Sequence, residues 1–211
     1  AALGDLSSPD RSTPETLDVS SPALGPALSF DDCEKDPSRL ANCGPAREFT
    51  GIQDWLNTPG GRALRLSALR GRVVLVDFWT YSCINCQRTL PYVTAWDAKY
   101  RDKGLTIVGV HSPEFAFEHD VDNVADQAAR LGVAYPIAID NDFRTWRAYD
   151  QRFWPAHYLI DRDGIVRQVH YGEGAYEETE NLIRQLLDEK GADTAAVAAP
   201  VTAAVAPAVV P

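Results

Sequence analysis

The stretch from Val73 to Pro91 limits what this chain can fold into more than any other part of the sequence. Its first part, Val73–Trp79, is apolar apart from Asp77 and is rich in β-branched and aromatic residues. A short continuous run of this kind is typical of a central strand that is covered on both faces. The sequence therefore predicts a buried strand that carries one carboxyl group.

The apolar period changes after Cys83. The apolar residues now follow one another at steps of four, three, three and four, which places them on one face of a helix. We expect Thr80 or Ser82 to cap the start of this helix, and Pro91 to kink it. The residues on the predicted buried face are Cys86, Leu90, Val93, Trp96 and Tyr100.

The position of the two cysteines predicts redox chemistry. Cys83 stands at the helix N-terminus, where free backbone N–H groups and the helix dipole favour a negative charge. This lowers the pKa of a thiol and leaves more of the nucleophilic thiolate. Cys86 follows one turn later on the same side, close enough to close a disulfide and release a partner from a mixed disulfide. We therefore interpret Cys83 as the nucleophile and Cys86 as the resolving thiol.

A zinc half-site is the alternative, because two cysteines at this spacing also suit zinc. Such a site needs a second pair of ligands. The four histidines form no such pair in the sequence, so we favour redox chemistry and expect no metal and no other cofactor. These histidines are His111, His119, His157 and His170.

The run DFWTYSCINC at residues 77–86, with Pro91 five residues later, resembles a thioredoxin-fold active site. Together with the preceding FTGIQDWLN at 49–57, it resembles the extracytoplasmic TlpA/ResA-like branch. It is most similar to the thioredoxin-like domain of DipZ-type proteins, which is joined to a CcdA/DsbD-like membrane electron carrier. The resemblance covers about Glu48 to Glu189. It implies an α/β thioredoxin fold, with a central mixed β-sheet flanked by helices and an extra N-terminal β-hairpin.

The resemblance also implies roles for residues around the cysteines. Asp77 would transfer a proton to or from Cys86 during exchange; the alternative is a hydrogen-bonded structural carboxyl group. Pro155 matches the family's cis-proline and would lie beside Cys83. The backbone of Trp154 would bind an extended substrate peptide, while its side chain either packs in the core or contacts substrate.

Two departures from common thioredoxins concern the residues around the cysteines. Ser82 stands where those proteins carry tryptophan, and we count it among the substrate-binding residues. The pair between the cysteines is Ile84-Asn85, which carries no positive charge. We therefore expect a moderately low reduction potential, that of a reductant. The acidic residue that tunes TlpA/ResA-like sites has no match, because Glu114 falls at a different position.

A second cysteine pair, Cys33 and Cys43, flanks a short polar segment. We favour a structural disulfide that staples the leader, since small-loop disulfides are common outside the cytosol. A second redox relay and two free thiols are the alternatives. We expect a flexible leader with this pair at 1–45, a thioredoxin-like domain at 46–190 and an Ala/Pro-rich linker or tail at 191–211.

The remaining pattern predicts alternating strands and helices, and hence a parallel βαβ unit. Leu64 and Leu66 alternate with Arg65, as in a half-buried strand. Asn141 is expected to cap a short helix. Further strands are expected at 105–110, 135–140, 156–160 and 165–171, and helices at 121–131 and 176–189.

Charge and composition exclude several classes of function. The net charge of −10 argues against nucleic acid as a partner, and no apolar run is long enough to span a bilayer. With no methionine and no visible signal peptide, we expect a processed chain or a fragment. The resemblance implies an extracytoplasmic location, tethered to or part of a membrane protein. Its partners would be protein disulfides or dithiols and a CcdA/DsbD-like membrane electron donor.

Three functions remain open at this point. The first is a thiol–disulfide oxidoreductase that reduces protein disulfides, with cytochrome c biogenesis as an outlet by resemblance alone. The second is a peroxiredoxin-like peroxide reductase, because Thr80 precedes Cys83 by three residues. The third is a non-enzymatic copper-binding module that uses both thiols and a distant histidine such as His157.

Overall fold

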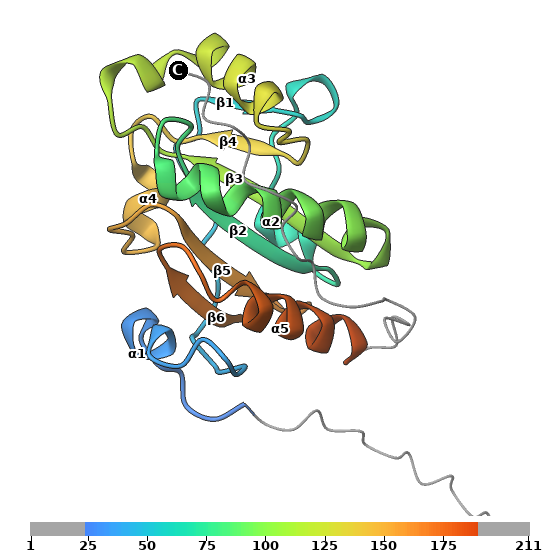
Figure 1. The fold of residues 1–211 in the computed structure, drawn as a ribbon. Coiled ribbons are helices and arrows are strands. Elements are labelled where there is room, and N and C mark those ends of the chain that lie inside the picture. The colour runs from blue at the N-terminus through green and yellow to red at the C-terminus, as the bar shows by residue number, and fades with distance from the viewer. Residues whose placement is uncertain (1–23, 190–211) are drawn as a thin grey trace, which may run out of the picture.

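A six-stranded mixed sheet with the order β1-β4-β3-β2-β5-β6 forms the centre of the structure (Figure 1). The computed structural model describes residues 24–189, so the expected tail and the first part of the expected leader lie outside the described residues. β2, β3 and β4 run parallel, whereas β1, β5 and β6 are each antiparallel to their neighbours. The strands are β1 (Asp54–Leu56), β2 (Val73–Trp79), β3 (Leu105–His111), β4 (Ile137–Ile139), β5 (Ala156–Ile160) and β6 (Val166–Tyr171).

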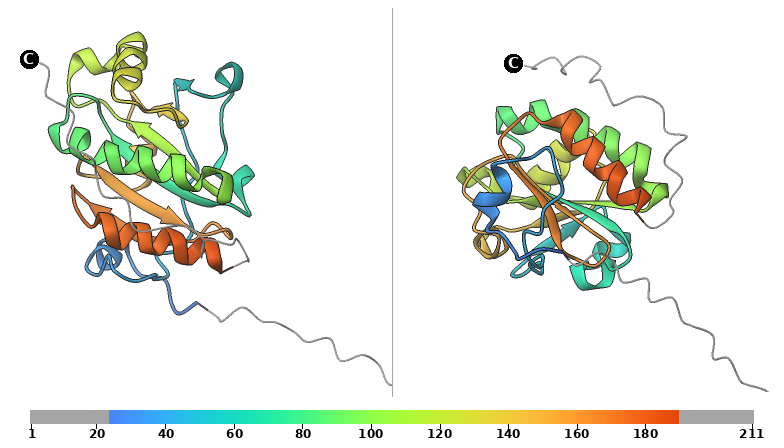
Figure 2. Two further views of the ribbon diagram at one scale, coloured as in Figure 1. Left: turned by 45° about the vertical axis from the view of Figure 1, so that its right-hand side comes forward. Right: turned by 90° about the horizontal axis from the view of Figure 1, so that it is seen from below.

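Helices cover both faces of this sheet. Figure 2 shows the longest two, α2 and α5, together on one side of the sheet, with α1 on the other. The helices are α1 (Phe30–Glu34), α2 (Ile84–Tyr100), α3 (Val121–Arg130), α4 (Arg144–Ala148) and α5 (Tyr176–Asp188). Short 3-10 turns occupy Pro59–Gly61, Leu66–Leu69, Arg101–Lys103 and Ala116–His119. A mixed sheet flanked by helices confirms the predicted α/β thioredoxin fold.

The central strand β2 contributes to two apolar clusters, one on each face of the sheet. Val73, Leu75 and Trp79 pack with α2, α3 and α5. Val74, Val76 and Phe78 pack with α1 and the segment around α4. Because successive side chains of a strand point to opposite faces, Asp77 lies on the face that α2 covers. The strand therefore delivers a buried carboxyl group to the side of the sheet that carries the cysteines.

The start of α2 differs from the prediction. Cys83 itself is the N-cap residue, and its sulfur accepts a hydrogen bond from the Cys86 backbone N–H at 3.3 Å. The predicted caps, Thr80 and Ser82, are both wrong, because their side chains are turned toward other partners described below. The helix continues through Pro91 to Tyr100.

The expected N-terminal β-hairpin is wrong in its second strand. β1 pairs with β4, and a 3-10 turn at Leu66–Leu69 takes the place of the predicted strand around Leu64 and Leu66. The Glu48 carboxylate accepts hydrogen bonds from the backbone N–H groups of Leu66 at 2.5 Å and Ser67 at 3.1 Å. These donors are therefore not free to enter a β-ladder.

The cap of α4 is also different from the prediction. Asp140, not Asn141, accepts hydrogen bonds from the N–H groups of Thr145 at 3.1 Å and Trp146 at 2.8 Å. The side chain of Asn141 instead donates to the carbonyl of His119 at 2.9 Å. Phe143 is the N-cap residue itself and makes no side-chain cap, so Asp140 supplies the acceptors from three residues earlier in the chain.

The described part of the expected leader packs against the edge of the sheet. Cys33 and Cys43 are joined by a disulfide bond and are both buried. The segment that follows lies along β6: the N–H of Cys43 donates to the carbonyl of Val166 at 2.9 Å, and the N–H of Val166 donates to the carbonyl of Gly44 at 2.9 Å. This pairing covers part of an edge strand that would otherwise expose unpaired backbone groups.

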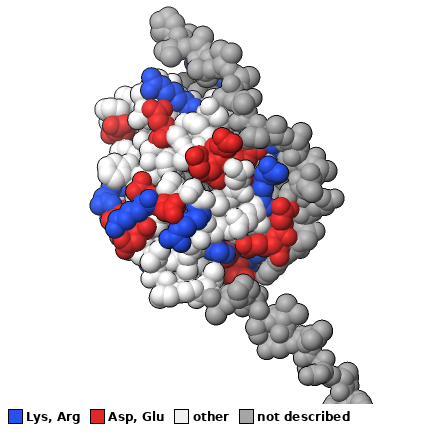
Figure 3. Space-filling view, turned by 60° about the horizontal axis from the view of Figure 1, so that its bottom comes forward, with Lys and Arg blue, Asp and Glu red and all other residues white. Residues whose placement is uncertain are grey.

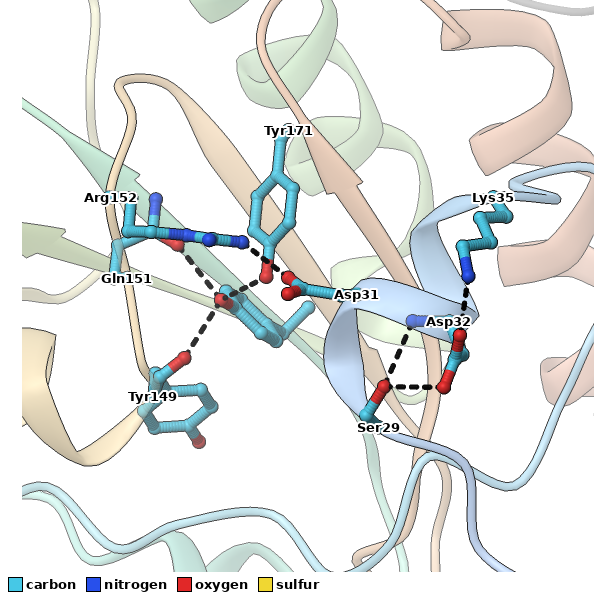
Figure 4. Close-up of polar contacts among 9 residues, drawn as sticks. Ser29, Asp31, Asp32, Lys35, Tyr149, Gln151, Arg152 and Tyr171 are labelled. Atoms are coloured by element: carbon cyan, nitrogen blue, oxygen red, sulfur yellow. Dashed lines mark hydrogen bonds and ion pairs between the residues drawn. The ribbon is translucent and has the colours of Figure 1, made fainter.

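Helix α1 contacts the loop that leads into β5. Phe30 packs edge-on against Tyr158, with ring centroids 5.2 Å apart. Figure 4 shows Asp31 of α1 paired with Arg152 in that loop, and Ser29 and Lys35 on either side of Asp32. The leader segment is thereby attached to the loop just before Pro155.

The surface carries charges of both signs. On the face shown in Figure 3, Lys and Arg side chains lie among Asp and Glu side chains and do not merge into one basic field. Over residues 24–189, no helix combines the length and the apolar character that a membrane crossing requires.

Candidate active site

Cys83 presents a partly exposed sulfur at the N-terminus of α2. A hydrogen bond from the Cys86 side chain, helped by the backbone N–H groups of Cys86 and Asn85, lowers the pKa of the Cys83 thiol to about 7. Partial burial and the charge of Glu114 act in the opposite direction. About half of Cys83 is therefore thiolate near neutral pH.

Cys86 has the opposite character. It is buried, and burial raises the pKa of its thiol, with Cys83 and the charge of Asp77 adding to the rise. Both cysteines are free thiols in the structure. The same helical turn thus holds one thiol that ionises readily and one that keeps its proton until a base removes it.

Asp77 lies in the middle of β2 and is almost completely buried. One carboxylate oxygen accepts a hydrogen bond from the Tyr135 hydroxyl at 3.1 Å, and the other lies 3.3 Å from Nε2 of His157. Gly109, opposite Asp77 on β3, makes room for this arrangement. A Cβ atom there would lie 2.8 Å from the Trp79 indole nitrogen and 3.1 Å from the Tyr135 ring.

Glu118 is a buried carboxylate beside the cysteines that sequence reasoning missed. Its Oε1 accepts hydrogen bonds from the backbone N–H and the hydroxyl of Ser82, at 3.2 and 2.6 Å. Its Oε2 accepts from the N–H groups of Glu114 at 2.5 Å and Phe115 at 2.9 Å. Burial opposes ionisation, but hydrogen bonds from Ser82 and Thr80 hold the pKa of Glu118 below its usual value.

These contacts make Glu118 a bridge between two loops. It joins the turn before Cys83 to the loop after β3. The turn that carries Cys83 is thereby attached to a distant part of the chain. The contact of Thr80 with the ring of His111 at 3.2 Å supports the same turn. Burial lowers the pKa of His111 to about 4, so this ring is neutral near pH 7. In the sequence, Glu118 lies in the run FAFEHD at residues 115–120. This run matches no motif or spacing that would single out its glutamate.

The peptide bond between Trp154 and Pro155 is cis, as the resemblance implied. The Trp154 indole N–H donates to the carbonyl of Ser112 at 3.0 Å, and its ring packs against Trp146 with centroids 4.3 Å apart. The side chain of Trp154 is thus engaged inside the protein. The hydroxyl of Ser82 is likewise engaged by Glu118.

Three large apolar side chains stand exposed on the segments around Cys83. Ile84 follows the cysteine directly, and Phe115 and Phe117 lie in the loop that Glu118 binds through the backbone N–H of Phe115. The two phenyl rings stack at 5.5 Å, and Phe117 also contacts the ring of Tyr81 at 6.1 Å. We call Ile84, Phe115 and Phe117 the apolar rim.

The arrangement is suited to thiol–disulfide exchange. It combines an exposed low-pKa thiol, a buried high-pKa thiol on the next turn and a buried carboxyl group whose charge reaches the second thiol. Within residues 24–189, no group of three or more His, Cys, Asp or Glu side chains is placed to hold a metal ion. The ring of His157 faces the carboxylate of Asp77.

The fold and the cysteine pair define a thioredoxin-like domain of the thiol–disulfide oxidoreductase class, and comparison with known proteins gives its family. The Redoxin family matches residues 44–187. The chain belongs to the Redoxin family, in its TlpA/ResA-like branch and related to DipZ.

Individual relatives support this assignment. The chain is 52% identical over 160 residues to Protein DipZ of Mycobacterium bovis, covering 76% of this chain but 23% of that protein. It is 30% identical over 145 residues to the thiol-disulfide oxidoreductase YkuV of Bacillus subtilis, covering 69% of this chain and 95% of YkuV. The chain thus spans about a quarter of the length of its DipZ relatives.

Solved structures agree with the fold. A structure described as the thiol:disulfide interchange protein DsbE from Chlorobium tepidum superposes with a TM-score of 0.60 at 27% identity, over 70% of this chain and 99% of that one. A thioredoxin-like protein in its oxidised form gives a TM-score of 0.62 at 29% identity, over 72% of this chain and 97% of that one.

Proposed function

We propose that this chain is an extracytoplasmic thiol–disulfide oxidoreductase that reduces disulfides of protein partners through Cys83 and Cys86. The observation that carries the proposal is the contrast between the two thiols. The pKa of Cys83 lies at about 7, while burial raises the pKa of Cys86. An exchange enzyme needs this order, because the accessible thiol must attack first and the buried thiol second.

The proposed reaction has two displacements. The Cys83 thiolate attacks one sulfur of the partner's disulfide, and the other sulfur leaves as a thiolate. Asp77 then takes the proton of the Cys86 thiol, and the new thiolate attacks the Cys83 sulfur. The partner leaves as a dithiol. The two electrons that reduced its disulfide came from Cys83 and Cys86, which are now joined by a disulfide.

Substrate would bind over the apolar rim and along the backbone beside Pro155. The rim offers apolar surface on the segments around the sulfur, and an extended peptide would pair with the backbone of Trp154, just before the cis-proline. Because the Trp154 side chain is engaged with Ser112 and Trp146, its backbone is the part proposed to face the substrate. Glu118 engages both the N–H and the hydroxyl of Ser82, so Ser82 is proposed to contribute through its carbonyl group.

The location and the electron donor are the finer parts of the proposal. The buried Cys33–Cys43 disulfide supports a compartment outside the cytosol, since disulfides rarely persist within it. Similarity to DipZ supports a membrane thiol carrier of the CcdA/DsbD type as the donor. We propose that such a carrier returns the pair to the dithiol after each cycle.

Insulin reduction with a dithiol donor tests the activity. The wild-type chain is expected to turn over, whereas Cys83→Ser and Cys86→Ser are expected to lose turnover. A reduction potential for the Cys83–Cys86 pair below that of typical oxidants of the DsbA kind, about −120 mV, would support a reductant. A potential as high as that value would reverse the proposed direction of electron flow.

A further inference from the structure

A row of paired residues crosses the sheet beside the candidate active site. Asp77 on β2 lies opposite His157 on β5, and His157 lies opposite His170 on β6. Directly opposed residues of antiparallel strands project to the same face. All three side chains therefore lie on the face that α2 and α5 cover, where the buried Cys86 also packs.

His157 is buried and faces Asp77 at contact distance. Its Nε2 lies 3.3 Å from the Asp77 carboxylate, and neither ring nitrogen has an aligned hydrogen bond to another group of residues 24–189. The indole ring of Trp96 covers the imidazole from α2, with centroids 6.1 Å apart. A buried imidazolium and a buried carboxylate are each costly alone, and their opposite charges offset that cost.

We propose that His157 is a positioning residue for the second step of exchange, which keeps Asp77 ionised and ready to take the Cys86 proton. This inference rests on the proposed function. With His157 as imidazolium and Asp77 as carboxylate, the buried site is neutral while Cys86 holds its proton. When that proton moves to Asp77, the imidazolium balances the new Cys86 thiolate, so the site is again neutral.

The rest of the step balances as follows. The Cys86 thiolate forms a bond to the Cys83 sulfur, and the bond between Cys83 and the partner's sulfur breaks. The partner departs as a thiolate with its electron pair. The proton on Asp77 then leaves the site to neutralise that thiolate through solvent, which restores the carboxylate opposite His157.

The other titratable groups near the pair are neutral, are paired, or act on His170. Burial lowers the pKa of His170 to about 4, so its ring carries no charge near pH 7. Burial also raises the pKa of Tyr135, which keeps its hydroxyl proton. Around the same site, Glu180 is paired with Lys99 and Tyr100, Asp97 is paired with Arg101, and Glu178 acts on His170.

The test separates the two displacements with an aromatic disulfide, 5,5′-dithiobis(2-nitrobenzoate). Attack by Cys83 releases one coloured thiolate, and resolution by Cys86 releases the second. In His157→Gln, the pH midpoint of the second phase is expected to shift up by about one unit, since an opposite charge shifts a carboxyl pKa by roughly 1–3 units. At pH values well below the wild-type midpoint, the second phase should therefore slow about tenfold. The first phase should match the wild type.

Two comparisons make the result specific. His170→Gln removes the neighbouring buried imidazole of the same row and should reproduce the wild-type profile of the second phase. In an Asp77→Asn background, His157→Gln should add no further slowing, because the imidazole acts through the carboxylate. An unchanged second phase in His157→Gln, or full slowing in the Asp77→Asn background, would overturn the inference.

Failure of the proposed function gives a different result. If the wild-type chain releases no second thiolate, the Cys83–Cys86 exchange itself is wrong. Should His157→Gln not fold, NMR titration of the His157 ring decides in the wild-type and Asp77→Asn chains. Loss of the carboxylate must lower the imidazole's titration midpoint, and equal midpoints in the two chains would contradict the pairing.

Discussion

Replacing Cys86 by alanine tests how the Cys83 sulfur is activated. The hydrogen bond from the Cys86 side chain is the largest contribution to the low pKa of Cys83, whereas the backbone donors of Cys86 and Asn85 remain in the variant. A hydrogen bond to a charged group is worth about 1.5 kcal/mol or more, which corresponds to roughly one pKa unit. We expect the pKa of Cys83 to rise from about 7 to roughly 8.

The rate of alkylation then changes in opposite directions at two pH values. At pH 7 the thiolate fraction falls from about a half to about a tenth, while a thiolate of higher pKa is about threefold more nucleophilic per unit, so the net rate falls by about twofold. At pH 9 both chains are mostly ionised, and the variant should react about threefold faster. The crossing of the two profiles distinguishes a pKa change from a loss of access.

The assay is the rate of iodoacetamide alkylation of Cys83 across this pH range, followed by mass. Asn85→Ala is the matched control, because it removes a side chain between the cysteines but keeps the backbone N–H that contacts the sulfur. Its profile should follow the wild type. A Cys86→Ala midpoint that stays at about 7 would show that backbone donors and the helix dipole suffice, and the assigned role of the Cys86 thiol would be wrong.

Three further predictions concern stability and can be measured by urea unfolding. Glu118→Ala leaves three partly buried backbone N–H groups without their acceptor and should cost about 3 kcal/mol; a loss below about 1 kcal/mol would refute the bridging role. Gly109→Ala forces a methyl group against Trp79 and Tyr135 and should cost about 1–3 kcal/mol, with an unchanged midpoint as the contrary result. Cys43→Ala opens a short disulfide loop and should cost about 2–3 kcal/mol under oxidising conditions, and equal loss with and without reductant would contradict a staple.

The parts of the fold that were predictable are those set by local pattern. The bounds predicted for β2 match the observed strand, Val73–Trp79. A strand buried on both faces is apolar at nearly every position, so its ends are visible in the sequence. The change of period after Cys83 placed α2, and Tyr176 was the correct first residue of α5. The fold class and the family could be predicted from the motif at residues 77–86.

Long-range contacts decided the parts that sequence reasoning missed. Asp140 and Asn141 are equally suited by local rules to accept hydrogen bonds from the start of α4, but only Asp140 does so, while the Asn141 amide donates to the carbonyl of His119 and Phe143 is the N-cap residue. Glu48 turns Leu66 out of a strand by binding its backbone N–H. Such choices depend on which residues the fold brings together, and no local period records them.

The candidate site divides in the same way. Cys83 and Cys86 carry their chemistry in their spacing, so the sequence was sufficient to select them. Glu118 reaches Ser82 across 36 residues, and His157 faces Asp77 only because β2 and β5 pair in a particular register. Both are buried charged or titratable groups whose partners come from other elements, and both became visible only in the structure.

Trapping the mixed disulfide tests the central claim most directly. Reduced Cys86→Ser is incubated with a disulfide-bonded protein such as insulin, and the covalent adduct is located by peptide mass. The account predicts one partner chain attached at Cys83, released by a dithiol, and no adduct with Cys83→Ser. An adduct at Cys86 in the Cys83→Ser chain, or none at Cys83 in the Cys86→Ser chain, would contradict the assignment of Cys83 as the attacking thiol.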